Sequence, residues 1–301
     1  MSLSTVTSKF HINLVSRSYN CFMNFYFKYC TSESSKFHKD ESKNETHFGF
    51  QTVPESEKVK KVYEVFENVA DKYDLMNDVM SFCTHRIWKD IFIQRLGPTP
   101  GTHLLDVAGG TGDIAFRYLK YLRNIPKSNK TSISYEKSSV TICDINTAML
   151  NVGKERGDKL GFRDPEIKWI EGDAENLPVD NNVFTAYTIA FGIRNCTHVD
   201  KVLDEAYRVL KPGGRFMCLE FSHVNNEALQ WLYDQYSFQI IPVLGQIVAG
   251  DWKSYQYLVE SIRKFPNQEE FKEMIQASGF SSVSYENLTG GVVSIHSGFK
   301  L

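Results

Sequence analysis

The sequence lacks the features that mark several large classes of protein. Its 301 residues carry a net charge of −2, from 34 Lys and Arg against 36 Asp and Glu. They contain no basic stripe of the kind that sequence-general nucleic-acid binding needs. No window reaches the about 18–20 consecutive apolar residues of a membrane-spanning helix. The sequence therefore predicts neither a nucleic-acid-binding protein nor a membrane-spanning one, and its length suits one large domain with a tail.

Closely paired cysteines are also missing. No two cysteines form a C-x-x-C pair; the six are Cys21, Cys30, Cys83, Cys143, Cys196 and Cys218. Disulfide scaffolds and zinc sites are recognised by such close spacings. We therefore expect reduced thiols, no disulfide framework and no metal site.

Acidic residues are absent from the start of the chain. None precedes Glu33, whereas Lys9, Arg17 and Lys28 do, together with several serines. An acid-poor, serine-rich N-terminus is typical of a mitochondrial presequence. We therefore expect residues 1–46 to form a mitochondrial presequence and disordered tail, with a tail of no targeting role as the alternative.

The remaining residues, 47–301, are expected to form one domain that begins with a helical cap at 47–100. Apolar residues recur at helical spacing from Val59 to Tyr73. A turn-like Asp-Leu-Met-Asn sequence follows at 74–77, and a second helix passes through Trp88. The Gly-Pro-Thr-Pro-Gly sequence at 97–101 ends the cap.

After the cap, strand-like and helix-like patterns alternate. We predict strands at 103–107, 139–143, 167–171, 183–190 and 215–221, and helices near 113–122, 147–159 and 199–210. A polar insertion at 123–137 predicts a mobile loop. Such alternation predicts a parallel sheet with helices on both faces. A helix near 268–278 and two β-like runs, 281–286 and 291–299, predict an antiparallel edge. The expected fold is α/β and Rossmann-like, with a mostly parallel seven-stranded sheet.

The most informative stretch is Leu-Leu-Asp-Val-Ala-Gly-Gly-Thr-Gly-Asp at 104–113, where an apolar strand meets a glycine-rich turn and a helix. Glycine accepts positive φ and lets a ligand approach the backbone, and a helix N-terminus offers unpaired N–H groups. Two interpretations compete: residues 110–115 fit the dinucleotide pattern G-x-G-x-x-A, whereas Asp106 and the glycines resemble the loop of class I S-adenosylmethionine-dependent methyltransferases. Asp106 and Asp113 would repel a pyrophosphate but suit an ammonium and a sulfonium, so we favour the second. The loop residues Asp106, Gly110, Thr111 and Gly112 are candidate cofactor contacts.

Acidic residues also follow the next two predicted strands. In open α/β sheets ligands bind outside the carboxyl ends of the strands. Asp144 could accept both hydrogen bonds of a ribose diol there, or cap the helix that follows. Asp173 could accept from an adenine amino group, while Ala174 offers its backbone N–H to a ring nitrogen. Arg194 and Asn195, after the fourth strand, lie where a substrate would approach.

Two further segments resemble the ubiquinone/menaquinone-biosynthesis C-methyltransferase family. The first is Tyr-Asp-Leu-Met-Asn-Asp-Val-Met-Ser at 73–81 with His85 and Trp88, and the second runs from Arg208 to Ser222. The sequence at 47–53 and the glycine loop also match, so the resemblance covers about residues 46–301. It implies that Thr111, Asp144, Asp173 and Ala174 contact the donor. One departure is Ala190, where bacterial relatives tend to have a serine contact.

The resemblance implies transfer of a methyl group from S-adenosylmethionine to a ring carbon of a polyprenyl benzoquinol, without a metal. A ring carbon becomes nucleophilic when a ring hydroxyl loses its proton, so a base is needed. The candidates for acid–base and positioning roles are Tyr73, Asp74, His85, Arg194 and Asn195. Arginine is a poor base because its pKa exceeds about 12, so we expect Arg194 to stabilise a phenolate or orient a water.

The family resemblance and the presequence together imply a protein of the mitochondrial matrix, peripheral to the matrix face of the inner membrane. Other coenzyme Q biosynthesis proteins, in a multi-subunit complex, and a homodimer are the implied partners. The apolar segment 229–248 predicts a groove for the polyprenyl tail or a face on the membrane, or else ordinary helix packing or a dimer face. An O-methyltransferase, a non-catalytic scaffold and a nicotinamide oxidoreductase remain alternatives.

Overall fold

The computed structural model describes residues 45–69, 73–125 and 138–301. The expected presequence therefore lies almost wholly outside the described residues, as does most of the polar insertion. Along the chain the elements are β1 (Glu45–Phe48), β2 (Gln51–Pro54), α2 (Glu55–Val69), α3 (Tyr73–Ser81), α4 (Thr84–Leu96), β3 (His103–Val107), α5 (Asp113–Arg123), β4 (Ser139–Asp144), α6 (Thr147–Lys159), β5 (Ile167–Glu171), β6 (Phe184–Ala190), η2 (Ile193–Asn195), α7 (Val199–Val209), β7 (Leu210–Phe221), α8 (Glu227–Gln235), η3 (Tyr236–Ile240), α9 (Ile241–Ala249), α10 (Trp252–Lys264), α11 (Gln268–Ala277), β8 (Ser281–Leu288), η4 (Thr289–Gly291) and β9 (Val293–Phe299).

The central sheet has seven strands in the order β5-β4-β3-β6-β7-β9-β8. The first five of these are parallel, and β9 runs antiparallel to both β7 and β8. The expectation of a mostly parallel seven-stranded sheet with an antiparallel edge is therefore confirmed. The strand order reverses beside β3, whose neighbours are β4 and β6, and this is the place where α/β folds bind ligands.

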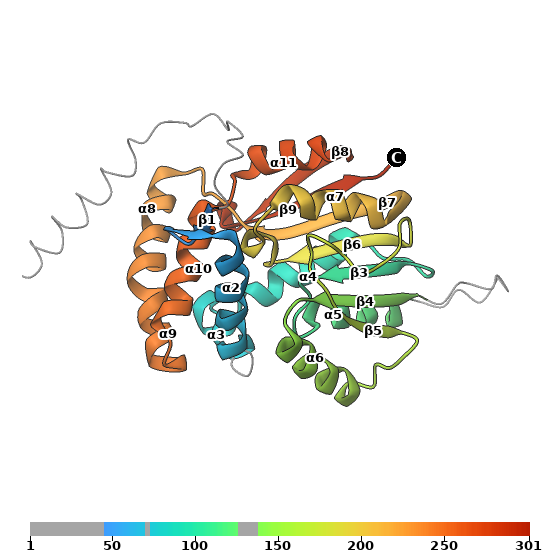
Figure 1. Ribbon diagram of the computed structural model, residues 1–301, viewed down its shortest axis with the longest axis horizontal. Helices are drawn as coiled ribbons and strands as arrows, with labels where there is room; N and C mark the ends of the chain where they lie inside the picture. The colour runs from blue at the N-terminus through green and yellow to red at the C-terminus, as the bar shows by residue number, and fades with distance from the viewer. Residues whose placement is uncertain (1–44, 70–72, 126–137) are drawn as a thin grey trace, which may run out of the picture. The chain divides into compact units, whose positions relative to one another are not determined.

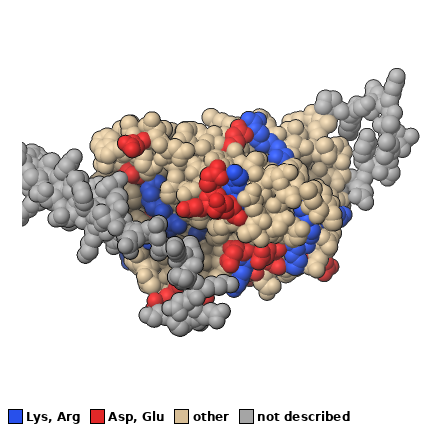
Figure 2. Space-filling view, turned by 90° about the horizontal axis from the view of Figure 1, so that it is seen from above, with Lys and Arg blue, Asp and Glu red and all other residues tan. Residues whose placement is uncertain are grey.

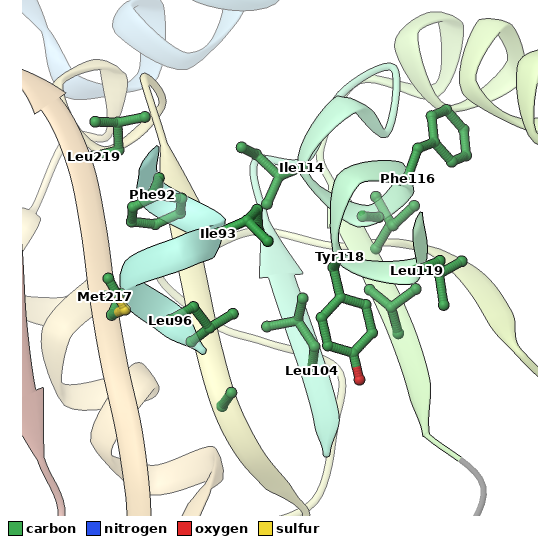
Figure 3. Close-up of a cluster of buried hydrophobic side chains, with 14 of the residues drawn as sticks. Phe92, Ile93, Leu96, Leu104, Ile114, Phe116, Tyr118, Leu119, Met217 and Leu219 are labelled. Carbon is green, nitrogen blue, oxygen red and sulfur yellow. The ribbon is translucent and has the colours of Figure 1, made fainter. Parts of the chain in front are cut away.

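Successive residues of the strands point to opposite faces of the sheet and feed two separate cores. Leu104 packs with one cluster and Leu105 with the other, and both are fully buried. Helices α4 and α5 cover the first face, where Phe92 and Tyr118 meet side chains of the sheet (Figure 3). Helices α7 and α11 cover the second. This alternation, two residues per repeat, fixes the direction in which each strand end points.

A helical group of α2, α3, α8, α9 and α10 lies at one end of the sheet, and within it α9 contacts both α3 and α10 (Figure 1). Met76 and Met80 of α3, one turn apart, are buried against Ile241 and Tyr255. The prediction of a turn at 74–77 is wrong, because burying these two methionines stabilises helix over the turn tendency of Asp and Asn.

Two other local predictions differ from the structure. The strand pair β1–β2, at the start of the predicted helical cap, has only four residues in each strand, too few for a recognisable pattern. Strand β7 begins at Leu210 rather than at 215, and a bulge opposite Phe184–Ala186 absorbs the break sequence Lys-Pro-Gly-Gly. Gly213 takes φ +82° within it, a conformation that glycine adopts without strain.

Charges are mixed on the surface. On the face seen in Figure 2, apart from what the grey atoms cover, small groups of acidic and basic side chains lie interspersed among uncharged ones. Within residues 45–69, 73–125 and 138–301, no helix has both the length and the apolarity to cross a bilayer.

Candidate active site

A cavity opens at the carboxyl ends of the parallel strands; we call it the strand-end cavity. It is lined by residues 108–111, 144–146, 172–175, 190–192 and 195–197, by Lys89, Asp106, Asp113, Ile114 and Met149, and by one face of α2. The predicted contacts Asp106, Gly110, Thr111, Asp144, Asp173 and Ala174 all lie in this lining. The strand ends therefore bring together six of the seven residues that were predicted to bind the cofactor.

Gly112 is the seventh, and it is not among the lining residues. It is the N-cap of α5, with φ +81°, and a Cβ there would lie 2.8 Å from Trp169 and 3.0 Å from Phe116. Its role is to let the loop turn tightly over these rings. Ala108, two residues after Asp106, takes φ +50°, a left-handed conformation that costs an L-residue roughly 1–2 kcal/mol.

Asp144 holds the loop and the next helix start together. Its Oδ2 accepts from the backbone N–H of Gly110 and its Oδ1 from that of Asn146, each at 2.8 Å. Burial raises the pKa of Asp144, and these backbone N–H groups oppose the shift. The helix cap is Asn146, whose side chain accepts from the N–H of Met149, so Asp144 does not act as the N-cap. A carboxylate has about four lone-pair positions, which leaves acceptor capacity toward the cavity.

Asp106 is fully buried at the end of β3. Its Oδ1 accepts from the hydroxyl of Thr188 at 2.8 Å, while Oδ2 has no hydrogen-bond partner among the described residues. Burial raises the pKa of Asp106 to about 7. An unsatisfied buried carboxylate oxygen costs free energy that a cationic ligand would recover.

Helix α2 forms a wall of the strand-end cavity with Val59, Val62, Tyr63 and Phe66. Asn146 donates to the carbonyl of Tyr63 at 3.3 Å, and the buried Lys58 donates to the carbonyl of Cys196 at 2.9 Å. The apolar spacing in this helix was visible in the sequence. The sequence did not show that this helix covers a cavity as well as core, because the same apolar spacing occurs in both situations.

A second cavity, the apolar cavity, adjoins the first. It is lined by the last part of α2, by α3 and α4, by residues after β6, by the end of β7, by residues at η4, and by α8, η3, α9 and α10. Trp88, Phe191 and Phe221 form an aromatic cluster in its wall, with ring centroids 4.9–6.3 Å apart. Four residues line both cavities and mark their seam: Phe66, Lys89, Phe191 and Asn195. Phe191 takes φ +57°, and strained backbone of this kind clusters at functional sites.

His85 lies in the wall of the apolar cavity and is 6% exposed. Its Nε2 is 2.9 Å from Oδ1 of Asp78, which also accepts from Arg86, and its Nδ1 is buried without a hydrogen-bond partner among the described residues. The guanidinium of Arg86 holds the pKa of Asp78 well below its usual range. Burial lowers the pKa of His85.

Arg194 and Asn195 lie on η2, directly after β6. Arg194 lines the apolar cavity, and its Nη1 donates to Oε1 of Glu220 at 2.8 Å and to the carbonyl of Phe191 at 2.6 Å. Its Nε is buried without a hydrogen-bond partner among the described residues. Burial raises the pKa of Glu220, and Arg194 opposes the shift. Asn195 Oδ1 accepts from the hydroxyl of Tyr257 at 3.1 Å.

Tyr73 and Asp74 are the first residues of α3. Their side chains are outside the described part of the structure, so the two remain candidates on the sequence alone.

Three charged partners were not singled out from the sequence: Lys89, which lines both cavities, and Asp78 and Glu220, which bond to the lining residues His85 and Arg194. Lys89 stands one helical turn after His85, a spacing that places two residues on one face and was available as a signal. Glu220 lies 26 residues from Arg194 on the neighbouring strand, and no local pattern reports such a pairing. Within the described residues, no three His, Cys, Asp or Glu side chains gather as a metal site would require.

Comparisons with known proteins agree with this architecture. A SAM-dependent methyltransferase of Thermotoga maritima has the same fold, with a TM-score of 0.55 at 17% identity, and the match covers 80% of this chain and 100% of that one. A methyltransferase of Methanococcus maripaludis described as S-adenosylmethionine-dependent gives 0.51 at 20% identity, over 78% and 93%. The chain thus has the fold of the SAM-dependent methyltransferases.

Curated relatives are far more similar in sequence. The mitochondrial 2-methoxy-6-polyprenyl-1,4-benzoquinol methylase of Drosophila melanogaster is 66% identical over 261 residues, which is 85% of each chain. The human protein of that name is 58% identical over 278 residues, again 85% of each. The model of the ubiE/COQ5 methyltransferase family matches residues 52–300. This chain therefore belongs to the ubiE/COQ5 methyltransferase family.

Proposed function

We propose that this methyltransferase moves the methyl group of S-adenosylmethionine to a ring carbon of 2-methoxy-6-polyprenyl-1,4-benzoquinol, a step of ubiquinone biosynthesis. The observation that carries the proposal is the pair of adjoining cavities, one rich in acids and one lined largely by apolar and aromatic side chains, which share a seam at Phe191 and Asn195. Relatives at 57–66% identity bear the name of this reaction, which supports the choice of acceptor.

The donor would occupy the strand-end cavity. Asp144 would accept from the ribose diol, Asp173 from the adenine amino group, and the N–H of Ala174 would donate to a ring nitrogen. Asp106 would face the methionine ammonium with its unpartnered oxygen. Five acids line this cavity, namely Asp106, Asp113, Asp144, Asp173 and Glu175. That charge disfavours the pyrophosphate of a nicotinamide cofactor and supports a cationic donor.

The quinol ring would occupy the apolar cavity, in contact with the aromatic cluster of Trp88, Phe191 and Phe221. Tyr233, Tyr236 and Ile241 from α8, η3 and α9 extend the apolar wall. This supports a role for segment 229–248 in holding the start of the polyprenyl tail. Other side chains of the segment are exposed, Trp231 by 60% and Ile247 by 74%, and they suit a membrane surface.

We assign the base to His85. Asp78 is ionised and can only accept, so Nε2 of His85 must carry the proton and Nδ1 the free lone pair. Nδ1 would take the proton of a ring hydroxyl, and the ring carbon would then displace the sulfide from the methyl group. The ring proton at that carbon would then be lost to water, and His85 would return its proton to the ring oxygen, which restores the aromatic quinol and the neutral base. The remaining candidates would position: Arg194 toward a ring oxygen, Asn195 at the seam, and Tyr73 and Asp74 from the start of α3.

Location and partners remain part of the proposal. The relatives' names include the word mitochondrial, which supports residues 1–46 as a presequence ahead of a methyltransferase domain at 47–301, in the matrix and peripheral to the inner membrane. The exposed apolar side chains on α8 and α9 would also serve a homodimer or other coenzyme Q biosynthesis proteins. Fusion of residues 1–46 to a fluorescent protein tests the targeting; cytosolic fluorescence would contradict it.

The deciding experiment is an assay with isotopically labelled S-adenosylmethionine and a short-tailed 2-methoxy-6-prenyl-1,4-benzoquinol. We expect the label on a ring carbon, and its loss in Asp144→Ala but not in Asp158→Ala, an exposed position of the neighbouring α6. Mass analysis that finds the label on oxygen would favour an O-methyltransferase. No label in either position, with S-adenosylhomocysteine still bound, would favour a scaffold.

A further inference from the structure

Lys89 is a buried cation at the seam of the two cavities. It lies on α4, is 6% exposed and lines both the strand-end cavity and the apolar cavity. Long basic side chains are almost never this buried unless a partner or a ligand uses the charge. The burial of this ammonium therefore indicates that an anion pairs with it.

One anion is already bound. The Nζ of Lys89 donates to Oδ2 of Asp113 at 2.8 Å, and Arg117 donates to the other oxygen of the same carboxylate at 3.2 Å. Burial alone would raise the pKa of Asp113, but Lys89 and Arg117 outweigh it and lower the value to about 2. An ammonium has three N–H donors, and the bond to Asp113 occupies one. Asp113 thus fixes the ammonium in place without exhausting it.

Lys89 differs in the sign of its charge from the acids that line the strand-end cavity. Against the five acids of the strand-end cavity, Lys89 is the one Lys or Arg among the described residues of its lining. The proposed donor is a zwitterion at its methionine end, and the carboxylate there cannot pair with any of the acids. The start of α5 lies beside Lys89 and has no side-chain cap at Gly112, so its first N–H groups add positive potential.

We propose that the Nζ of Lys89 binds the carboxylate of the donor's methionine end, with Asp113 as the residue that positions the ammonium. The inference rests on S-adenosylmethionine as the donor and adds the residue that binds its carboxylate. It also accounts for the orientation of the donor, because a carboxylate held at the seam and an adenine near Asp173 place the sulfonium between them.

The test compares two ligands that differ only in that carboxylate. S-Adenosylhomocysteine and its decarboxylated analogue are titrated calorimetrically into the full chain. We expect the wild type to bind S-adenosylhomocysteine about 10- to 100-fold more tightly, as one charge-assisted hydrogen bond allows. In Lys89→Met this preference should fall to below about twofold. Lys89→Gln provides the same comparison with a polar side chain if Lys89→Met does not fold.

The matched control is Lys300→Met. Lys300 is also a buried lysine, 9% exposed, but it bonds the side chain of Asn182 and the carbonyl of Tyr207 and does not line either cavity, so this variant should keep the preference. Equal affinity of the wild type for the two ligands would overturn the proposal, and so would an unchanged preference in the Lys89 variants. Loss of quinol turnover with an intact ligand preference would assign Lys89 to the acceptor instead. Failure of methyl transfer alone would count against the acceptor chemistry and leave this binding result standing.

Discussion

Nε2 of His85 lies 2.9 Å from Oδ1 of Asp78, and the opposite ring nitrogen is buried in the wall of the apolar cavity without a hydrogen-bond partner among the described residues. The ionised Asp78 fixes the proton on Nε2, so the lone pair resides on Nδ1 before any substrate arrives. A base prepared in this way requires no rearrangement at the moment of reaction.

Replacing His85 by Gln should lower kcat by about 10²- to 10⁴-fold, the usual contribution of a general base. Affinity for S-adenosylhomocysteine should change little, because His85 lines only the apolar cavity. The pKa of His85 is lowered by burial, so the wild-type rate should rise with pH below about 6.5 and level off above it. The variant should lose this acidic limb. His223→Gln, outside both cavities, is the control; an unchanged kcat in His85→Gln would remove the base assignment.

The two acids that bracket the glycine loop should give pH effects of opposite sign on stability. The pKa of Asp106 is raised from 3.8 to about 7 in the folded chain, so folding stability falls as pH rises between these values, by up to about 4 kcal/mol. The pKa of Asp113 is lowered to about 2, so its contribution is lost as pH falls below about 4. Urea unfolding from pH 2 to pH 8 measures both.

Asp106→Asn should remove the loss of stability toward neutral pH, and Asp113→Asn should remove the loss toward acid. Asp106→Asn that left the slope between pH 4 and pH 7 unchanged would show that another group titrates there.

Substitutions in the buried pair of Arg194 and Glu220 should change both the stability of the fold and the turnover. Their side chains are 5% and 1% exposed, and removing one partner of a buried ion pair costs about 3–5 kcal/mol. Arg194→Met should therefore lower the melting temperature, and Glu220→Gln added to it should restore part of the loss because no buried carboxylate is left unpaired. Turnover should stay low in both variants while donor affinity falls less. Collapse of donor binding in Arg194→Met would contradict a role on the acceptor side.

Substitutions at two glycines with similar backbone conformations should distinguish the cost of backbone strain from the cost of a side-chain clash. Gly112 and Gly161 have φ +81° and +74°, but a Cβ at Gly112 would meet Trp169 at 2.8 Å, whereas nothing lies within 4 Å at Gly161. Gly161→Ala should cost about 1–2 kcal/mol for the left-handed backbone alone. Gly112→Ala should cost more and weaken S-adenosylhomocysteine binding. Equal losses of stability with intact binding would mean that the loop tolerates the displacement.

The exposed apolar side chains of α8 and α9 should matter only when the acceptor is in a bilayer. Trp231→Glu and Ile247→Glu should lower turnover of a long-tailed quinol in liposomes but not of a short-tailed quinol in water. Leu160→Glu, at an apolar residue 43% exposed at the end of α6, is the control. Equal effects on the two substrates would favour a packing role.

The sequence predicted the sheet and the strand-end residues well, for a physical reason. Parallel strands end at one edge, so Asp106, Asp144 and Asp173 are brought together by topology alone. The apolar cavity could not be predicted in the same way, because its walls come from segments that are far apart in the chain. Tyr236, for example, donates to the carbonyl of Met80 across 156 positions. The turn predicted at 74–77 failed for the same reason, since its helical state depends on partners in α9 and α10.

Helix α4 fixes the distance between two side chains that line the cavities. His85 and Lys89 are four residues apart on it, about 6 Å along the axis and on the same side, and the helix is anchored in the core by Phe92 and Ile93. A single inserted residue between them would swing one side chain by about 100° relative to the other. Because the core holds this one helix in place, the packing of α4 determines how far apart the two cavity walls lie.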